Sequence, residues 1–242
     1  MRVGVYAAFY IAWKDVRVYY LKAPNLTYGL MMPVALYLAF GVTGHLNLGT
    51  LVSGLVSLVI LFGTMSIEAV AVVMEKQTRT MDRLMAAPVS PLTVVLGKAL
   101  AGAFLGPLIA AAVLLPLTVY SGGSIGSPLL VFLAILVSSF TFSALGVLVS
   151  SYARWVPEAQ MYSNLLRFPM AFLAGTFVPL EAMSPWLQGI ARFLPLTYSV
   201  EALRSAMGGE AASTYLMDMA ALAVFSAAVV AGSAWMLERS RD

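Results

Sequence analysis

Charged side chains are scarce in this sequence. Lysine, arginine, aspartate and glutamate together make up 10% of the 242 residues, whereas apolar residues make up 61%. A soluble domain carries roughly 25% charged residues, so this chain has too little polar surface to stay dissolved. We therefore expect an integral membrane protein in which most side chains contact lipid or one another.

The residue types that carry most enzyme chemistry are also few. Cysteine is absent, which excludes disulfides and thiolate sites, and His45 is the single histidine, whereas a zinc metalloprotease needs two on one helix. An intramembrane aspartyl site needs two aspartates within membrane helices, and only Asp218 lies near one. The one Gly-Lys pair, Gly97-Lys98, has Leu92 in place of the first glycine of a phosphate-binding loop. We predict no catalytic residues, no metal and no cofactor bound by this chain.

The apolar runs predict an all-α membrane domain with six spans over residues 1–242. A spanning helix needs about 20 predominantly apolar residues. Apolar runs that contain at most one charged residue each, separated by polar or turn-forming segments, satisfy this at residues 26–44, 51–74, 92–120, 128–151, 159–180 and 217–237. A Gly- and Ser-rich turn at residues 121–128 separates the third span from the fourth.

Residues 1–22 are predicted to form an amphipathic helix that lies in the membrane interface. On a helical wheel, one arc carries the charges of Lys14, Asp15, Arg17 and Lys22. The opposite arc carries apolar and aromatic side chains, namely Val5, Phe9, Ala12, Trp13, Val16, Tyr19 and Tyr20. We expect the charged arc to face water and the aromatic arc to lie at headgroup level. A frayed cytoplasmic tail is the alternative.

The positions of the cations predict the orientation. If both termini lie in the cytoplasm, 12 of the 14 lysines and arginines fall in or beside cytoplasmic segments, and only Arg192 and Arg204 lie outside. This agrees with the excess of cations that cytoplasmic loops carry. The net charge of +3 therefore indicates orientation in the cell membrane and not nucleic-acid binding.

Glu68 and Arg167 are ionisable residues inside the second and fifth predicted spans. Glu68 and Arg167 are costly in lipid, so they either face the bundle interior or a water-filled path, or extend to the cytoplasmic interface. Gly102 and Gly106 have the spacing that lets two helices approach closely, and we expect them to pack within one subunit.

The densest cluster of charges, which begins at Glu75, contains a predicted amphipathic helix at residues 78–87. Met81, Leu84 and Met85 would form an apolar ridge on one side of it, flanked by Asp82 and Arg83. The alternative is a solvated loop whose charges only set the topology.

Two stretches of sequence share a pattern with a known family. The first comprises Glu75, Thr80-Met81-Asp82-Arg83-Leu84, Ala87-Pro88-Val89-Ser90 and Gly97-Lys98. The second comprises residues 172–181, Pro185-Trp186-Leu187, residues 194–198 and Glu201-Ala202-Leu203-Arg204. Both resemble the ABC-2 type permeases, the membrane subunits of ATP-binding-cassette exporters. The chain departs from the family pattern at Arg79, where a glycine is common.

The resemblance implies a dimeric permease, formed from two copies or as a heterodimer, that is driven by a separate ATPase subunit which holds ATP and magnesium. The loop between spans two and three would be a coupling helix gripped by that ATPase, with contacts from Glu75, Thr80, Met81, Asp82, Arg83, Leu84, Met85 and Pro88. Two short helices between spans five and six would dip into the outer leaflet and carry Glu181, Trp186, Tyr198, Glu201 and Arg204, with Glu201 and Arg204 able to pair.

The resemblance also suggests the cargo, a lipophilic or amphipathic compound such as a drug or a lipid. A polysaccharide or glycolipid exporter is the alternative within the family. Outside it, an ion-coupled secondary transporter would need midplane carboxylates, for which Glu68 is the one acidic candidate. A non-transporting membrane scaffold would have no ATPase partner.

The predicted orientation can be tested directly, because the chain has no cysteine of its own. Single cysteines in place of Thr78, Arg154 or Ser240 should react with a membrane-impermeant maleimide only from the cytoplasmic side. Cysteines in place of Ser124 or Gln188 should react only from outside. Opposite labelling at any of these positions would overturn the topology.

Overall fold

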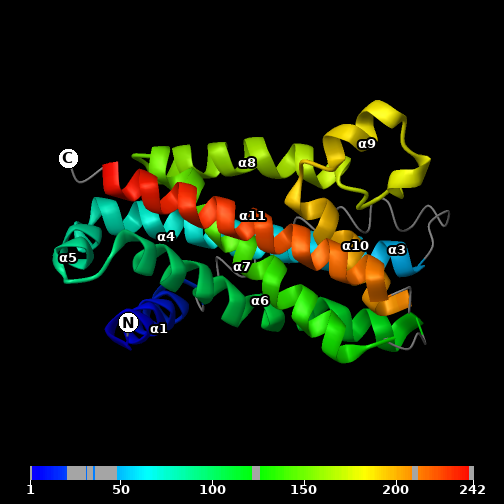
Figure 1. Cartoon of the computed structure of the whole chain (residues 1–242), viewed down its shortest axis with the longest axis horizontal. Helices are drawn as coiled ribbons and strands as arrows, with labels where there is room; N and C mark the ends of the chain where they lie inside the picture. The colour runs from blue at the N-terminus through cyan, green and yellow to red at the C-terminus, as the bar shows by residue number, and fades with distance from the viewer. Residues whose placement is uncertain are drawn as a thin grey trace.

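The computed structural model describes residues 2–20, 31, 35, 48–121, 126–208 and 212–239, and this part of the chain is helical with no strand. Its elements are α1 (Arg2–Asp15), the π-helical turn η1 (Val16–Tyr20), α3 (Leu48–Ile60), the π-helical turn η2 (Leu61–Met65), α4 (Ser66–Gln77), α5 (Thr80–Ala86), α6 (Pro91–Ser121), α7 (Pro128–Tyr152), α8 (Val156–Leu173), the 3-10 turn η3 (Leu180–Ala182), α9 (Pro185–Ala191), α10 (Pro195–Gly208) and α11 (Ala212–Arg239). The long helices lie side by side, with α5 at one end of the bundle and α9 at the other (Figure 1).

Four of the described helices are long and apolar enough to cross a membrane. They cover Val52–Gln77, Pro91–Pro116, Pro128–Tyr152 and Ala212–Arg239. These correspond to the second, third, fourth and sixth predicted spans, and they make the chain a multi-pass membrane protein. The first predicted span, residues 26–44, lies outside the described residues except for positions 31 and 35.

The fifth predicted span, residues 159–180, differs from the helix that forms there. α8 runs beside the other long helices (Figure 1), but it is not among the four apolar helices. It also ends at Leu173, because Gly175 has a φ of 77° and turns the chain out of the helical path. Residues 174–178 therefore form a bend and not the last turns of a span.

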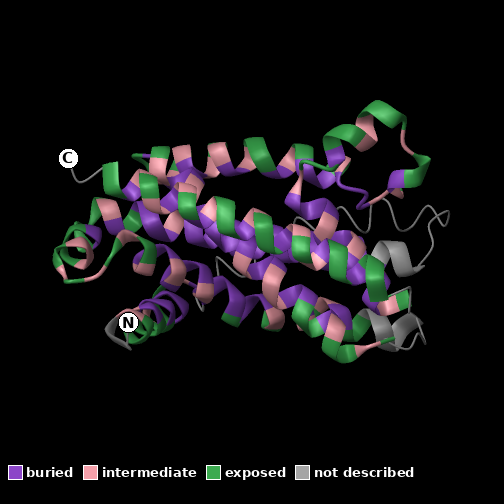
Figure 2. Ribbon diagram, viewed as in Figure 1, coloured by how far each residue is buried: buried purple, intermediate pink, exposed green. Residues whose placement is uncertain are grey.

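α7 is the central helix of the bundle. It contacts α6, α11, α4 and α10, and Figure 2 shows that buried residues follow the inward faces of these helices. Small polar side chains on α7, among them Ser139 and Ser143, are fully buried. They allow the neighbouring helices to approach closely, because they occupy little volume.

Gly102 and Gly106 of α6 pack against α7, which confirms the predicted close approach within one subunit. A Cβ atom at Gly102 would overlap the side chain of Ser143, and one at Gly106 would overlap Ser139. A larger residue at either position therefore forces α6 away from α7.

The region between α8 and α11 contains the two short helices that the sequence predicted, α9 and α10. α9 is mostly exposed, whereas α10 is part of the core and packs against α11, α7 and α3. Leu196, Val200 and Leu203 of α10 are fully buried. α10 is thus more deeply enclosed by protein than a helix that merely dips into a leaflet.

Replacement of Gly106 by valine should destabilise the bundle. Overpacking of a filled interior costs about 1–3 kcal/mol, so the midpoint of thermal unfolding of the purified protein should fall. The matched control is Gly189→Val on α9, because a Cβ at Gly189 meets nothing within 4 Å. Equal midpoints for the two variants would contradict the close approach of α6 and α7.

Candidate functional site

The loop after α4 forms the helix that the sequence predicted, α5. The turn that leads into it is made by Arg79, which has a φ of 55° and a ψ of 19°. This left-handed conformation costs most residues about 1–2 kcal/mol and costs glycine little. The turn therefore forms with arginine at a position that favours glycine.

The apolar ridge of α5 faces its own chain, which corrects part of the sequence-based interpretation. Met81 is buried against Val72 of α4 and Val94 of α6, and Leu84 and Met85 are half-buried against the same cluster. The ridge therefore seats α5 on the bundle. The face that points into solvent carries Asp82, Arg83 and Ala86, and Pro88 beyond the helix is also exposed.

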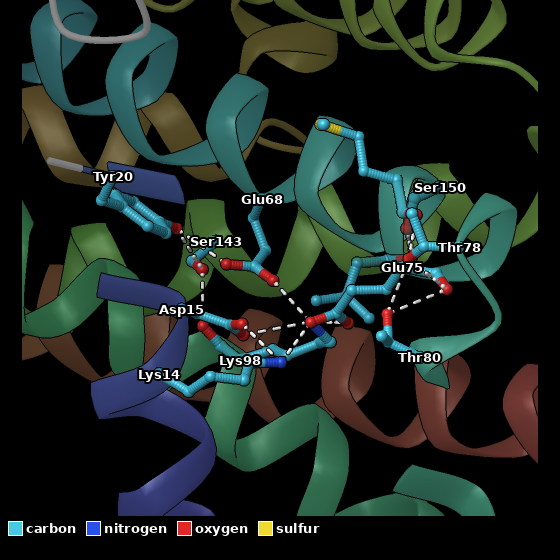
Figure 3. Close-up of polar contacts among 12 residues, drawn as sticks. Lys14, Asp15, Tyr20, Glu68, Glu75, Thr78, Thr80, Lys98, Ser143 and Ser150 are labelled. Carbon is cyan, nitrogen blue, oxygen red and sulfur yellow. Dashed lines mark hydrogen bonds and ion pairs between the residues drawn. The ribbon is translucent and has the colours of Figure 1, made fainter. Parts of the chain in front are cut away.

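Near α5 lies a group of five charged side chains, four of them buried and Lys14 partly exposed, which we call the charge cluster: Lys14, Asp15, Glu68, Glu75 and Lys98. The Lys98 ammonium on α6 lies 3.0 Å from Asp15 Oδ2, 3.3 Å from Glu68 Oε1 and 2.7 Å from Glu75 Oε2 (Figure 3). Lys14 forms ion pairs with Glu75 and, at 2.9 Å, with Asp15. The cluster thus joins α1, α4 and α6.

The cluster extends to α7 through Tyr20, which lies in the π-helical turn after α1. Its buried hydroxyl donates a hydrogen bond to Glu68 Oε2 at 2.9 Å and lies 3.3 Å from Ser143 Oγ. Ser143 in turn donates to the carbonyl of Lys98 at 3.0 Å. Four helices of the bundle therefore meet at one polar site.

Burial makes these charges depend on one another. Burial raises the pKa of the Asp15 carboxyl, but the ammonium groups of Lys98 and Lys14 outweigh this and hold that pKa below its ordinary value. Burial and Lys98 lower the pKa of the Lys14 ammonium, but Asp15 and Glu75 outweigh them and raise it. Both groups are therefore charged near neutral pH. A buried charge without its partner is costly, so the three segments are held in one arrangement.

The charge cluster is connected to α5 through the last turn of α4. The Glu75 carboxylate belongs to the cluster, while its backbone carbonyl accepts hydrogen bonds from the hydroxyls of Thr80 at 3.2 Å and Thr78 at 3.4 Å. The next residue, Lys76, donates to the carbonyls at the end of α7, Ser150 at 2.8 Å and Ser151 at 3.2 Å. Two consecutive residues thus link α5 to α1, α6 and α7.

Glu68 and Arg167 are both fully buried, so each faces protein and neither extends to the interface. They do not pair with each other, because Glu68 bonds to Tyr20 and Lys98. The Arg167 guanidinium donates to Asn164 Oδ1 at 2.7 Å and Gln160 Oε1 at 3.3 Å. Its central carbon also lies 4.7 Å from the centre of the Phe62 ring.

The predicted outer residues separate into two groups. Glu181, Tyr198 and Glu201 line one cavity at the end of the bundle opposite α5. Trp186 is exposed on α9, and Arg204 donates to the carbonyl of Gly175 at 3.3 Å. Arg204 therefore ties α10 to the bend after α8.

Most of the charge cluster is not predicted by the sequence pattern. Lys14 and Asp15 were assigned to a water-facing arc, but Asp15 is fully buried and Lys14 reaches inward. Ala12, Val16 and Tyr20 of the predicted lipid-facing arc are instead buried in protein, whereas Val5, Phe9 and Trp13 are exposed as expected. One signal was available: Lys98 lies within the apolar third span, where a lone ammonium needs partners.

Replacement of Lys98 by methionine should leave the cluster with three carboxylates and one ammonium. Removal of one partner from a buried ion pair costs about 3–5 kcal/mol, so the thermal unfolding midpoint should fall strongly. The added change Glu75→Gln removes one of the stranded carboxylates, so the double variant should lose less stability than the sum of the single losses.

Glu68→Gln and Arg167→Met share no contact, and as a control pair their losses should add. Strict additivity for Lys98 and Glu75 would contradict the cluster.

Comparison with known proteins identifies several relatives. The chain is 32% identical over 95 residues to Nodulation protein J of Neorhizobium galegae, which covers 39% of this chain and 36% of the relative. It is 32% identical over 164 residues to ABC transporter G family member 20 of Dictyostelium discoideum, which covers 65% of this chain and 22% of the relative. It is 24% identical over 148 residues to "Probable multidrug ABC transporter permease YbhR" of Escherichia coli, which covers 61% of this chain and 40% of the relative.

These matches span less than half the length of each relative, so they describe a shared membrane region. The family match is more extensive. Residues 6–207 match the ABC-2 type transporter family, a range that includes α5, the charge cluster, α9 and nearly all of α10. Because this match covers most of the chain, the protein belongs to the ABC-2 type transporter family.

Proposed function

We propose that this chain is the permease subunit of an ABC exporter and that a separate ATPase subunit drives it through α5. The observation that carries the proposal is the link from α5 to the charge cluster. An exposed helix is seated by Met81 and joined through Glu75 to side chains of α1 and α6. Members of the family act as transport subunits and are not themselves catalytic.

In this mechanism, a displacement of α5 is transmitted to the membrane helices. Closure of the ATPases on ATP would press on the exposed face of α5, which is short and firmly seated. The movement passes into the last turn of α4, because Thr80 is bonded to the Glu75 carbonyl. From there Glu75 moves Lys98 of α6 and Lys14 of α1, while Lys76 moves the end of α7. The four helices shift together, since separating buried charges is costly.

The docking face on α5 is formed by Asp82, Arg83 and Ala86, with the half-exposed edges of Leu84 and Met85 beside them. Charged and small side chains of this kind suit a groove of complementary charge on the partner. ATP and magnesium bind to that partner. A second copy of this chain completes the transport pathway, and a related permease would serve equally in a heterodimer.

The elements that lie at each end of the helix bundle support a cytoplasmic location for both termini. α1, α5 and the last turn of α11 lie at one end of the bundle, and α9 lies at the other (Figure 1). The cations of the cytoplasmic segments favour that end for the inner side of the plasma membrane. Export of a lipophilic or amphipathic compound is supported by the similarity to a probable multidrug permease.

Charge reversal at Arg83 should weaken the contact with the ATPase without unfolding the permease. Arg83 is exposed, so Arg83→Glu leaves the bundle intact. Interface anchors commonly contribute about 2 kcal/mol or more, which corresponds to roughly a thirtyfold loss of affinity. The measurements are co-purification of the ATPase and substrate-stimulated ATP hydrolysis, both of which should fall.

The matched control is Arg154→Glu, the same charge reversal on the exposed loop between α7 and α8. It should retain the ATPase. Leu84→Asp should also lose the ATPase, whereas Met81→Asp should lower the unfolding midpoint of the permease itself, because Met81 is buried within the chain. Normal ATPase binding and hydrolysis with Arg83→Glu would reject the docking face.

A further inference from the structure

A cavity of about 460 Å³, into which several polar and charged residues extend, lies at the end of the bundle opposite α5. It is bounded by η3, α9, α10 and α11, and its lining residues are Leu180, Glu181, Gln188, Arg192, Thr197, Tyr198, Glu201 and Met217. Its volume lies within the range of small-molecule sites, roughly 300–1,000 Å³. The lining combines carboxylates, a guanidinium, an amide and an aromatic ring.

A second feature is an apolar groove along α8. Two adjoining hollows of about 340 and 380 Å³ share Leu165 and Leu166 of α8. One extends toward Tyr152 at the end of α7. The other extends toward Phe193, which follows α9, and Phe225 of α11. The shared residues make these hollows one groove between α8 and its neighbours α7 and α11.

The cavity and the groove adjoin at a pair of aromatic rings. Tyr198 lines the cavity and Phe225 lines the groove, and their ring centres lie 5.8 Å apart. The consecutive residues Arg192 and Phe193 likewise line the cavity and the groove, respectively. A molecule with a polar head and an apolar tail would place each part in its matching environment.

The geometry points to a binding site for an amphiphile with an uncharged, hydroxyl-rich head in the cavity and an alkyl tail in the groove. Glu181 and Glu201 accept hydrogen bonds from hydroxyls, and Arg192 donates to hydroxyl oxygens. Two carboxylates disfavour an anionic head, and the guanidinium disfavours a cationic one, whereas a polyol uses both kinds of group. The inference rests on the proposed export of amphiphiles and narrows the cargo to alkyl glycosides and similar glycolipids.

The adjoining polar cavity favours an alkyl tail over a second copy of this chain as the occupant of the groove. An apolar helix face of another subunit would match the groove but not the polar side chains of the cavity. An alkyl glycoside fills both. The groove is also bordered by α7 and α11, two of the helices long and apolar enough to cross a membrane, where such tails are dissolved.

The site can be probed in the full-length permease, without the ATPase, in lipid nanodiscs. A single cysteine replaces Met217, which lines the cavity and is 73% exposed, and its rate of maleimide labelling is measured. The probes are dodecyl maltoside, dodecyl phosphate, dodecyltrimethylammonium and maltose, each below its micellar concentration. At about ten times its dissociation constant, dodecyl maltoside should slow labelling about tenfold. The charged probes and maltose should have little effect at the same concentration.

A larger side chain that fills the groove should reduce the protection that dodecyl maltoside gives to the cysteine at position 217. Leu165→Trp places a larger ring in the groove, and because Leu165 is 71% exposed the variant should fold. Leu108→Trp is the matched control, since Leu108 is a leucine of α6 that is 61% exposed and does not line the groove. Protection by dodecyl maltoside should persist in the control and fall at least several-fold with Leu165→Trp.

Three results would overturn the inference. Equal protection from labelling by all three alkyl probes would show that the cavity does not discriminate between their head groups. Full protection by maltose would show that no tail is bound, and protection unchanged by Leu165→Trp would exclude the groove. The coupling variant Arg83→Glu should leave protection intact, so a failure of ATPase docking and a failure of this site are distinguished.

Discussion

The ammonium group of Lys98 lies among carboxylates from two other parts of the chain, Asp15 at the end of α1 and Glu68 and Glu75 on α4. None of these groups is stable when buried alone, because an unpaired charge in an apolar interior is costly. Their mutual contact therefore fixes where α1 lies against the bundle. It also fixes the last turn of α4, from which α5 begins.

This constraint suits a helix that must transmit movement. A close-packed interior passes on displacement with little loss, and a buried ion-pair network resists partial separation. α5 is too short to be stable alone, but Met81 seats it and the Glu75 carbonyl holds Thr80. Energy supplied at one exposed face can thus reach α1, α6 and α7 through two residues, Glu75 and Lys76.

The features predicted well from the sequence are those set by local composition. Long apolar runs located four spanning helices, the ridge of residues 81–85 located α5, and the spacing of Gly102 and Gly106 indicated a close helix contact. The bend after α8 was missed because it depends on one backbone angle at Gly175. The charge cluster was missed because its members are up to 84 positions apart, and a helical wheel assigns Lys14 and Asp15 to water.

The central claim is that ATP-driven movement of α5 reaches α1 through Glu75. It is tested most directly by the distance between spin labels on α1 and α8, at Tyr6 and Met161, which are both exposed. In the permease assembled with its ATPase, ATP should shift this distance. The account predicts that Glu75→Gln abolishes the shift while the ATPase stays bound. A full shift in the Glu75→Gln protein would contradict it.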